Sequence, residues 1–434
     1  MKLSRITLAL AIAGLSFSAH ATNGYFSHGY GMKAKGMAGA STTNTEDAFF
    51  GANNPAAAAF AGNRLDLGVD LFSPKRKASR SGSYPYAGPY YGYIPGGLDG
   101  NSKSDSNYFL IPEFGYNKML NPNLALGVTV YGNGGMNTDY PGNATMFGTN
   151  LLGGQGRLGV DLMQLIVAPT AAYKIAPNHS IGISPLIGYQ RFKAEGLQGF
   201  GVMTPSGGNI GYDDAFGYGV RVGYLGKITP TVTIGAAYAS KMNFDEFSDY
   251  KNLFAEQGGF DIPENYNLGI SWQATPALRL ALDYQRINYS DVNSVGNAVL
   301  PNMMNGLGAD NGPGFGWDDI DVWKLGVEYK YNKAWTLRAG YSHTDSPIEG
   351  NMTCASLANC GETMFNILAP AVIEDHVTLG FTYTRDNGDE VTAAYMHGFK
   401  NDVKGLNPMP GFTPGIDKIE MYQNSLGIQY SWKM

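Results

Sequence analysis

Residues 265–273 read NYNLGISWQ, and this stretch decides the fold class of the chain. Its even-numbered positions are apolar or aromatic, and its odd-numbered positions are small or polar. Alternation with a period of two is typical of a β-strand that has two different faces. The same alternation recurs in residues 323–330, 377–384 and 425–432. From about Leu65 onward, the chain is therefore predicted to be a long series of strands.

The ends of the apolar faces distinguish a barrel from a soluble sandwich. Several apolar faces end in aromatic residues, namely Trp272, Tyr329, Tyr331, Tyr383 and Trp432. Such residues build the interfacial girdle of an outer-membrane barrel. The opposite faces carry charged residues, among them Arg279, Asp283, Lys324, Glu328 and Arg338. A water-filled lumen tolerates these charges and lipid does not, so the pattern indicates a transmembrane β-barrel.

The composition agrees with a membrane protein that crosses the bilayer without helices. The 434-residue sequence contains 59 glycines and 28 tyrosines, but only 15% of its residues are charged, whereas soluble domains average about a quarter. After the N-terminal segment, no apolar stretch reaches the length of a membrane helix. The formal net charge of −6 and the absence of a basic, aromatic stripe argue against a nucleic-acid partner.

Turn residues divide the strands into hairpins. Short turns containing Pro, Asn or Gly alternate along the chain with long connections rich in Gly, Pro, Asn and Asp. The predicted long loops are 74–105, 134–158, 195–212, 242–259, 291–318, 347–370 and 401–416. Short turns on one side and long loops on the other match the periplasmic and extracellular ends of an antiparallel outer-membrane barrel, and the segments number about fourteen.

The N-terminus predicts export. A basic start precedes the apolar residues 6–17, and the Ala-His-Ala sequence at 19–21 fits a cleavage site with small residues. We therefore expect residues 1–21 to be a signal peptide, with the mature protein beginning near Thr22 and located in the bacterial outer membrane.

Residues 22–64 do not alternate and precede the first strand. A fourteen-stranded barrel is too wide for its own side chains to fill, so it must be an open channel or be plugged. Within the segment, GANNPAAAAFAG (51–62) contains an Asn-Asn-Pro sequence that favours a sharp turn. We expect residues 22–64 to form a hatch inside the lumen of a barrel built by 65–434. A small, neutral tip could shift without leaving a buried charge unpaired.

The motifs of the chain, taken in order, resemble those of the FadL-type outer-membrane transporters of long-chain fatty acids and hydrocarbons. The motifs are GMKAKGMAGAS (31–41), Asn54-Pro55-Ala56, GNGGMNTDYPG (132–142), Asp345-Ser346-Pro347 and Tyr395-Met396-His397-Gly398. The resemblance covers essentially the whole chain after the signal peptide. It implies a fourteen-stranded barrel with an N-terminal hatch, a hydrophobic small-molecule substrate, and passive uptake.

The resemblance also implies a sideways exit. Substrate would leave into the membrane through a gap where the third strand kinks, near Gly132, Gly134 and Gly135. Glycine interrupts strand pairing and leaves no side chain to obstruct a gap. The Asn54-Pro55-Ala56 turn is then expected to touch the inner wall near this kinked strand. Release into lipid is favourable because an apolar solute gains nothing from entering water.

Fatty-acid transporters of this family hold the carboxylate with cations and a hydroxyl. In this sequence the corresponding positions fall on Gly196, Asp318 and Gly132. Arg191 and Lys193 are candidate substitutes for contacts to the head group. The substrate candidates are therefore long-chain fatty acids, neutral hydrocarbons and aromatic compounds.

Cys354 and Cys360 are the two cysteines of the chain. In an oxidising compartment, a close pair in a loop is expected to form a disulfide. No histidine lies nearby at ligand spacing, so we expect no metal site, and no cofactor motif is present. The expected surroundings are outer-membrane lipid and lipopolysaccharide, and we expect a monomer.

Two other functions fit a barrel less well. A general porin for polar solutes needs an open lumen, which the predicted hatch would close. A barrel enzyme needs a catalytic constellation, and the chain lacks the Gly-x-Ser-x-Gly motif of lipases. The sequence Ser342-His343-Thr344-Asp345 is no triad, because neighbours in an extended strand point to opposite faces.

Overall fold

The computed structural model describes residues 23–83, 86–88, 92–94, 99–145, 148–198, 210–354, 360–407 and 415–434. The predicted signal peptide at residues 1–21 lies outside these residues, as does Thr22.

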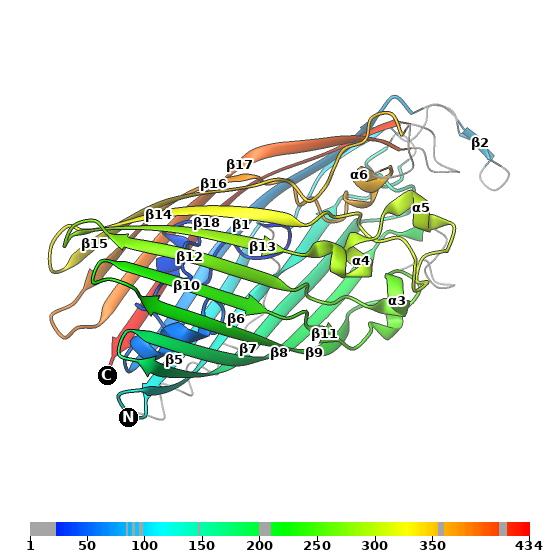
Figure 1. Cartoon of the computed structure of the whole chain (residues 1–434). Coiled ribbons are helices and arrows are strands. Elements are labelled where there is room, and N and C mark those ends of the chain that lie inside the picture. Colours follow the sequence, from blue (N-terminus) through cyan, green and yellow to red (C-terminus); the bar gives the residue numbers. More distant parts are fainter. Residues whose placement is uncertain are drawn as a thin grey trace.

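Fourteen long strands in the described part of the chain form one closed antiparallel barrel (Figure 1). They are β1 (Arg64–Ser81), β5 (Phe109–Met119), β6 (Leu124–Tyr140), β7 (Leu158–Ala176), β8 (His179–Glu195), β9 (Asp213–Lys227), β10 (Val232–Ala239), β12 (Asn265–Gln273), β13 (Leu278–Ile287), β14 (Ile320–Lys330), β15 (Trp335–Thr344), β16 (Asp375–Thr384), β17 (Glu390–Asn407) and β18 (Gly415–Lys433). Short strands β4 (Gly100–Lys103) and β11 (Asn243–Phe244) pair with β1 and β9, and β2 (Tyr86–Gly88) pairs with β3 (Gly92–Ile94). The predicted fold class is confirmed.

The first and last strands close the barrel. β1 and β18 pair along their whole length, from Arg64 opposite Lys433 to Ser81 opposite Ile416. A closed sheet leaves no free outer edge, which is what a strand structure requires in lipid.

Alternate side chains along each strand face lipid and lumen. On β14, Trp323 and Leu325 are about half exposed, whereas Lys324 between them and Glu328 further along the strand are buried. β12 follows the same rule, with Leu268, Ile270 and Trp272 exposed on the outside. The predicted division into an apolar outer face and a charged inner face is therefore present in the structure.

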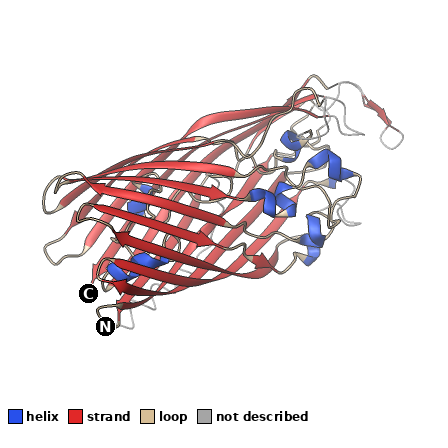
Figure 2. Cartoon of the chain, viewed as in Figure 1, coloured by secondary structure: helices blue, strands red, loops and turns tan. Residues whose placement is uncertain are grey.

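Helical segments lie at two levels of the barrel (Figure 2). Two belong to the N-terminal segment and lie inside the barrel, near the end where the short turns are: α2 (Met32–Lys35) and η1 (Pro55–Phe60). The others belong to the long loops at the opposite end: η3 (Ser248–Tyr250), α3 (Ala255–Gly258), η4 (Tyr289–Asp291), α4 (Asn293–Gly296), α5 (Val299–Met303) and α6 (Glu362–Phe365). None of the helices in the described residues has the length and apolar character needed to cross a membrane.

Three of the predicted loops begin too early. The loops expected from residues 74, 134 and 401 are still strand at these positions, because β1 continues to Ser81, β6 to Tyr140 and β17 to Asn407. Where a strand extends beyond the lipid, its outer face no longer needs apolar side chains, but its backbone hydrogen bonds to the neighbouring strands continue. The polar composition of these stretches was therefore a poor guide to where pairing ends.

Candidate functional site

The N-terminal segment from Asn23 to Asn63 lies inside the barrel and is largely buried. Its α2 packs against β16, β17 and β18, and its η1 packs against β7, β8, β9 and, less extensively, β6. Glycines on the inner wall permit close approach. A Cβ atom added to Gly340 would lie 2.4 Å from the carbonyl carbon of Met37, and one added to Gly427 would lie 2.1 Å from the sulfur of Met32. The segment (the hatch from here on) therefore spans the lumen.

Buried ion pairs fasten α2 to the wall. The Lys35 ammonium group lies 2.7 Å from the Asp70 carboxylate and 3.2 Å from that of Glu113. Lys33 makes a 2.7 Å ion pair with Glu390. Because withdrawing α2 would leave carboxylates buried and unpaired, this part of the hatch is anchored. The expected small, neutral tip lies at residues 51–62, whereas α2 is held to the wall by charge.

The Asn54-Pro55-Ala56 turn begins η1 and is fully buried. The side-chain oxygen of Asn54 accepts a hydrogen bond from the backbone N–H of Ala56 at 3.1 Å, which caps the helix. Its amide group donates to the carbonyl oxygens of Thr42 (2.8 Å) and Tyr224 (2.9 Å). Asn54 therefore fixes the turn both to the hatch and to the barrel wall.

The position of this turn corrects one expectation. The motif lies against Gly182 of β8 and Gly223 of β9, rather than near the kink of β6. η1 also contacts β6, and another part of the hatch does so too, since the backbone N–H of Gly51 donates to the hydroxyl of Thr129 at 3.1 Å. A local motif predicts a turn, but it does not contain the information about which wall the turn will contact.

The third barrel strand, β6, has a bulge at the predicted glycines. Its register against β7 shifts between Gly132 and Gly134, so that Asn133 has no opposite residue. On the other side, pairing between β5 and β6 runs from Met119 to Phe114 and stops there. Residues 109–113 of β5 and 131–137 of β6 are thus not paired with each other. We call this opening in the ladder the β5–β6 gap.

The start of the hatch covers the free edge of β6. Phe26 forms a β-bridge with Gly134. The backbone N–H of Ser27 donates to the carbonyl oxygen of Asn133 at 3.0 Å, and that of Gly135 donates to the carbonyl oxygen of Tyr25 at 3.1 Å. The contact is close, because a Cβ atom at Gly134 would lie 1.5 Å from the Tyr25 oxygen. Gly134 and Gly135 therefore serve as the docking edge for the hatch.

A chain of aromatic rings leads from the extracellular loops to this edge. The ring centroid of Phe192 lies 4.7 Å from that of Phe254, which lies 5.0 Å from that of Phe260. Phe260 is 6.0 Å from Tyr25, and Tyr25 is 5.8 Å from Trp317. All five side chains are almost completely buried. We call this row the aromatic path.

The outer end of the aromatic path borders a small apolar cavity beneath the loops. Apolar residues of β7, β8, α6 and the loops line it, together with Ser294. Its volume of about 30 Å³ holds roughly one water molecule, whereas ligand pockets usually measure about 300–1,000 Å³. Side chains must therefore move before a hydrocarbon can enter.

Arg191 and Lys193 do not face the lumen. On β8 the inward positions are Gln190, Phe192 and Ala194, which are buried. Arg191 instead lies 3.8 Å from the ring of Tyr212, an exposed residue, and Lys193 pairs with Glu195. Because neighbours on a strand point to opposite faces, the geometry contradicts a role for these two cations in binding a head group inside the barrel.

The other head-group positions also lack a suitable donor. Gly196 adopts a φ of +77° next to the backbone of Arg157. Asp318 is exposed at the end of the loop before β14, and partial burial together with the nearby Glu349 raises the pKa of its carboxyl group. Gly132 faces Ile111 across the β5–β6 gap, where an added Cβ would lie 3.6 Å from a methyl group.

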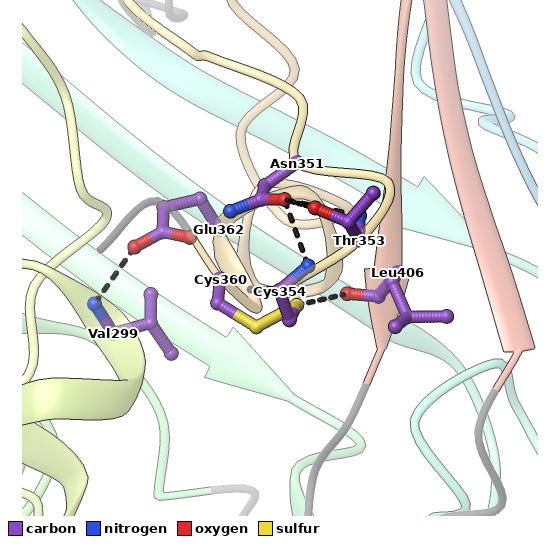
Figure 3. Close-up of a disulfide and its surroundings, with 7 residues drawn as sticks. All are labelled: Val299, Asn351, Thr353, Cys354, Cys360, Glu362 and Leu406. Carbon is purple, nitrogen blue, oxygen red and sulfur yellow. Dashed lines mark hydrogen bonds between the residues drawn. A yellow bond between two sulfur atoms is a disulfide. The ribbon is translucent and has the colours of Figure 1, made fainter. Parts of the chain in front are cut away.

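Cys354 and Cys360 are joined in a disulfide, with Cα atoms 5.4 Å apart (Figure 3). The backbone N–H of Cys354 donates to the side-chain oxygen of Asn351 at 2.9 Å. Nearby, Glu362 accepts a hydrogen bond from the backbone N–H of Val299 at 3.1 Å, which links α6 to α5. The disulfide thus belongs to the loop cluster over the barrel mouth. Among the described residues, no cluster of three or more His, Cys, Asp or Glu is arranged to hold a metal ion.

Comparison with known proteins gives consistent matches. The family model described as outer membrane protein transport protein (OMPP1/FadL/TodX) matches residues 13–407. A long-chain fatty acid transport protein of Escherichia coli O6:H1 is 22% identical over 347 residues, which are 70% of this chain and 73% of that protein.

Solved structures share the fold. The toluene transporter TodX of Pseudomonas putida superimposes with a TM-score of 0.65 at 19% identity, and a FadL homologue of Pseudomonas aeruginosa with a TM-score of 0.71 at 16% identity. The toluene transporter TbuX of Ralstonia pickettii gives a TM-score of 0.62 at 18% identity. Each alignment covers 94% of this chain and 99% of the other.

Proposed function

The chain belongs to the OMPP1/FadL/TodX family of outer-membrane transport proteins, and from this premise we propose that it takes up hydrophobic compounds passively and releases them sideways into the membrane. Proteins similar to this chain include a long-chain fatty acid transport protein and two toluene transporters. The proposed substrates are accordingly long-chain fatty acids, neutral hydrocarbons or aromatic compounds.

One observation carries the proposal: the aromatic path joins the cavity beneath the loops to the β5–β6 gap. An apolar solute on this path remains in contact with buried rings from Phe192 to Tyr25. Leaving such contacts for water would forfeit about 0.8 kcal/mol per methylene group, whereas leaving them for lipid would not. The gap is therefore the favourable exit, provided that Tyr25 and Phe26 move away from β6.

The hatch is well suited to such a partial movement. Lys33 and Lys35 hold α2 in place, and Asn54 holds η1. Residues 23–27 lie on the far side of these anchors and hold β6 through two backbone hydrogen bonds. We propose that this short end moves while the rest of the hatch stays, so that the gap opens without an aqueous pore through the barrel.

A reversible staple tests the exit. Cysteines replacing Ile111 and Gly132 would face each other across the β5–β6 gap, close enough for oxidation or a short thiol cross-linker to join them. We expect the cross-linked double variant to lose substrate uptake into cells or vesicles and to regain it on reduction. The single variant Gly132→Cys and the wild type, treated alike, control for the native disulfide. Normal uptake by the stapled protein would exclude this exit.

The environment of the protein completes the proposal. The path and the gap are formed within one chain, which supports function as a monomer. Lys77, Lys103 and Lys400 line a groove of about 410 Å³ on the barrel surface beside the loops, and they outnumber its two carboxylates, Asp105 and Glu420. Clustered cations of this kind pair with phosphate groups, so we propose that lipopolysaccharide contacts the protein here.

A further inference from the structure

Arg76 of β1 lies at the loop end of the β5–β6 gap and points into the barrel. Its side chain is 5% exposed, whereas its neighbours Lys75 and Lys77 lie on the outer face. The sequence prediction missed this residue, because residues 74–105 were expected to form a loop.

Arg76 is unusual among the buried arginines of the described residues because no carboxylate lies within ion-pair distance. Three others have such partners: Arg64 pairs with Asp66, Arg80 with Asp417 and Arg338 with Glu328. The fifth, Arg221, also lacks one, but it donates to hatch carbonyl groups and lines none of the cavities described above. A buried guanidinium group without a counter-ion is a strained arrangement that an anion would relieve.

The hydrogen bonds of Arg76 join the two margins of the gap. One terminal nitrogen donates to the carbonyl oxygen of Asn137 on β6 at 2.5 Å. The other donates to the carbonyl oxygen of Ser106, in the segment that leads into β5, and to the hydroxyl of Ser104 at 3.3 Å. The Nε donor is buried and has no hydrogen-bond partner among the described residues. Arg76 therefore acts as a clasp across the loop end of the gap, held by neutral oxygen atoms and by the ring of Phe109 on β5, whose centroid lies 5.7 Å from the guanidinium carbon.

The inner end of the aromatic path meets this clasp. Arg76 shares a small apolar pocket with Phe72, Met136, Trp317 and Met421. Trp317 also contacts Tyr25, which covers the edge of β6. A chain-like molecule that follows the path to Trp317 would bring its end group next to the guanidinium group. Asp139, the acidic residue near by on β6, is paired with Arg157 and does not neutralise Arg76.

We propose that Arg76 recognises the carboxylate end of an amphiphilic substrate and that this binding releases the clasp. A carboxylate accepts stronger hydrogen bonds from a guanidinium group than a neutral carbonyl does, and it can accept two at once. A bound carboxylate would therefore replace the carbonyl oxygens of Asn137 and Ser106 as hydrogen-bond partners of Arg76. The margins of the gap would then be less firmly joined. The proposal rests on the lateral path proposed above. It distinguishes fatty acids, which would open the clasp, from neutral hydrocarbons, which would not.

A matched pair of ligands tests the recognition step. Decanoate and 1-decanol have the same chain, and at about pH 8 decanoate is ionised. Calorimetry on the purified full-length protein should show that Arg76→Met weakens decanoate binding by about tenfold or more and changes decanol binding by less than about twofold. Arg76→Lys should keep most of the decanoate affinity. Lys75→Met removes the same charge from the outer face of the same strand and should behave as the wild type.

Each alternative result has a distinct meaning. Equal losses for both ligands in Arg76→Met, or no loss for either, would overturn the assignment of Arg76. A loss of decanoate affinity in Lys75→Met as large as that in Arg76→Met would do so as well. If the wild type bound neither ligand, the proposed function itself would fail.

Hydrogen exchange tests the release step independently. Decanoate should accelerate amide exchange at residues 104–107 and 134–138 of the wild type, and decanol should not. In Arg76→Met the same amides should exchange quickly without any ligand. Protection of these residues by decanoate would mean that the acid tightens the gap and would overturn the clasp.

Discussion

At the scale of single residues, Asn54 shows how one side chain positions a whole turn. The Asn54 side chain makes three hydrogen bonds: one caps η1, one holds the hatch residue Thr42, and one holds Tyr224 of β9. Its neighbour Asn53 makes a single side-chain bond, to the carbonyl oxygen of Tyr30, and is less buried. Asn54 is therefore expected to contribute more to the stability of the hatch than Asn53.

We expect Asn54→Ala to destabilise the hatch locally by about 1–3 kcal/mol, because it removes a helix cap and two side-chain hydrogen bonds to backbone carbonyl groups. Faster amide exchange of residues 40–60 measures the effect, and unchanged heat-modifiable migration on a gel shows that the barrel still forms. Asn53→Ala is the matched control and should have a clearly smaller effect. Equal exchange in both variants would refute the role given to Asn54.

Residue-level parity also shows what the sequence could and could not reveal about the site. Asp66 and Asp70 face the lumen, so continuing the alternation by even numbers would have placed Arg76 inside. The signal was present, but a basic, polar stretch looked like a loop. Tyr25 and Phe26 gave no such signal, because their role depends on a contact with Gly134, more than a hundred residues away.

At the scale of elements, we expect the stability of α6 in the loop cluster to depend on pH through Glu362. Burial raises the pKa of Glu362, in spite of the hydrogen bond from Val299, and one carboxylate oxygen has no partner among the described residues. A carboxyl group with a raised pKa favours folding while it is protonated. This contribution is complete below the ordinary glutamate pKa of about 4.3 and is lost as the pH rises through the raised value.

The local stability of α6 should therefore fall as the pH rises from about 4 upward through the raised pKa. Amide exchange at residues 362–366, corrected for the intrinsic effect of pH, measures this. Glu362→Gln should remove the dependence, because the amide keeps the acceptor for Val299 and cannot ionise. The same slope in the variant would show that another group titrates.

Elements also explain why the strands were easier to predict than the hatch. Apolar and polar side chains alternate in residues 265–273 because one face of the strand meets lipid and the other meets the lumen. This local pattern can be recognised in the sequence. The path of the hatch depends on which inner-wall positions lack a side chain, such as Gly340 and Gly427. That complementarity between distant segments cannot be read from local pattern, so the segment was predicted but its contacts were not.

At the scale of the whole molecule, the barrel is a wide cylinder closed by its own N-terminus. A purified general porin would conduct ions without further treatment, whereas a hatch anchored by α2 and η1 should block the flow of ions. Deletion of residues 23–60 should convert a nearly silent protein into a steadily conducting channel in planar bilayers. Circular dichroism and gel migration confirm assembly of the variant. High, steady conductance of the intact protein would instead favour the porin function.

The bridge that residues 25–27 form with β6 has a consequence for the cell. The outer membrane keeps out lipophilic poisons, and every entry route for oily nutrients weakens that defence. In the proposed route, the hatch end is held at β6 by two backbone hydrogen bonds, each contributing about 0.5–1.5 kcal/mol, by hydrogen bonds of Asn23 and Tyr25 with the Tyr289 hydroxyl, and by the packing of two rings. Under the proposed lateral exit, the organism's exposure to solvents and apolar antibiotics would depend on how often residues 25–27 detach from β6, and not on the diameter of the barrel.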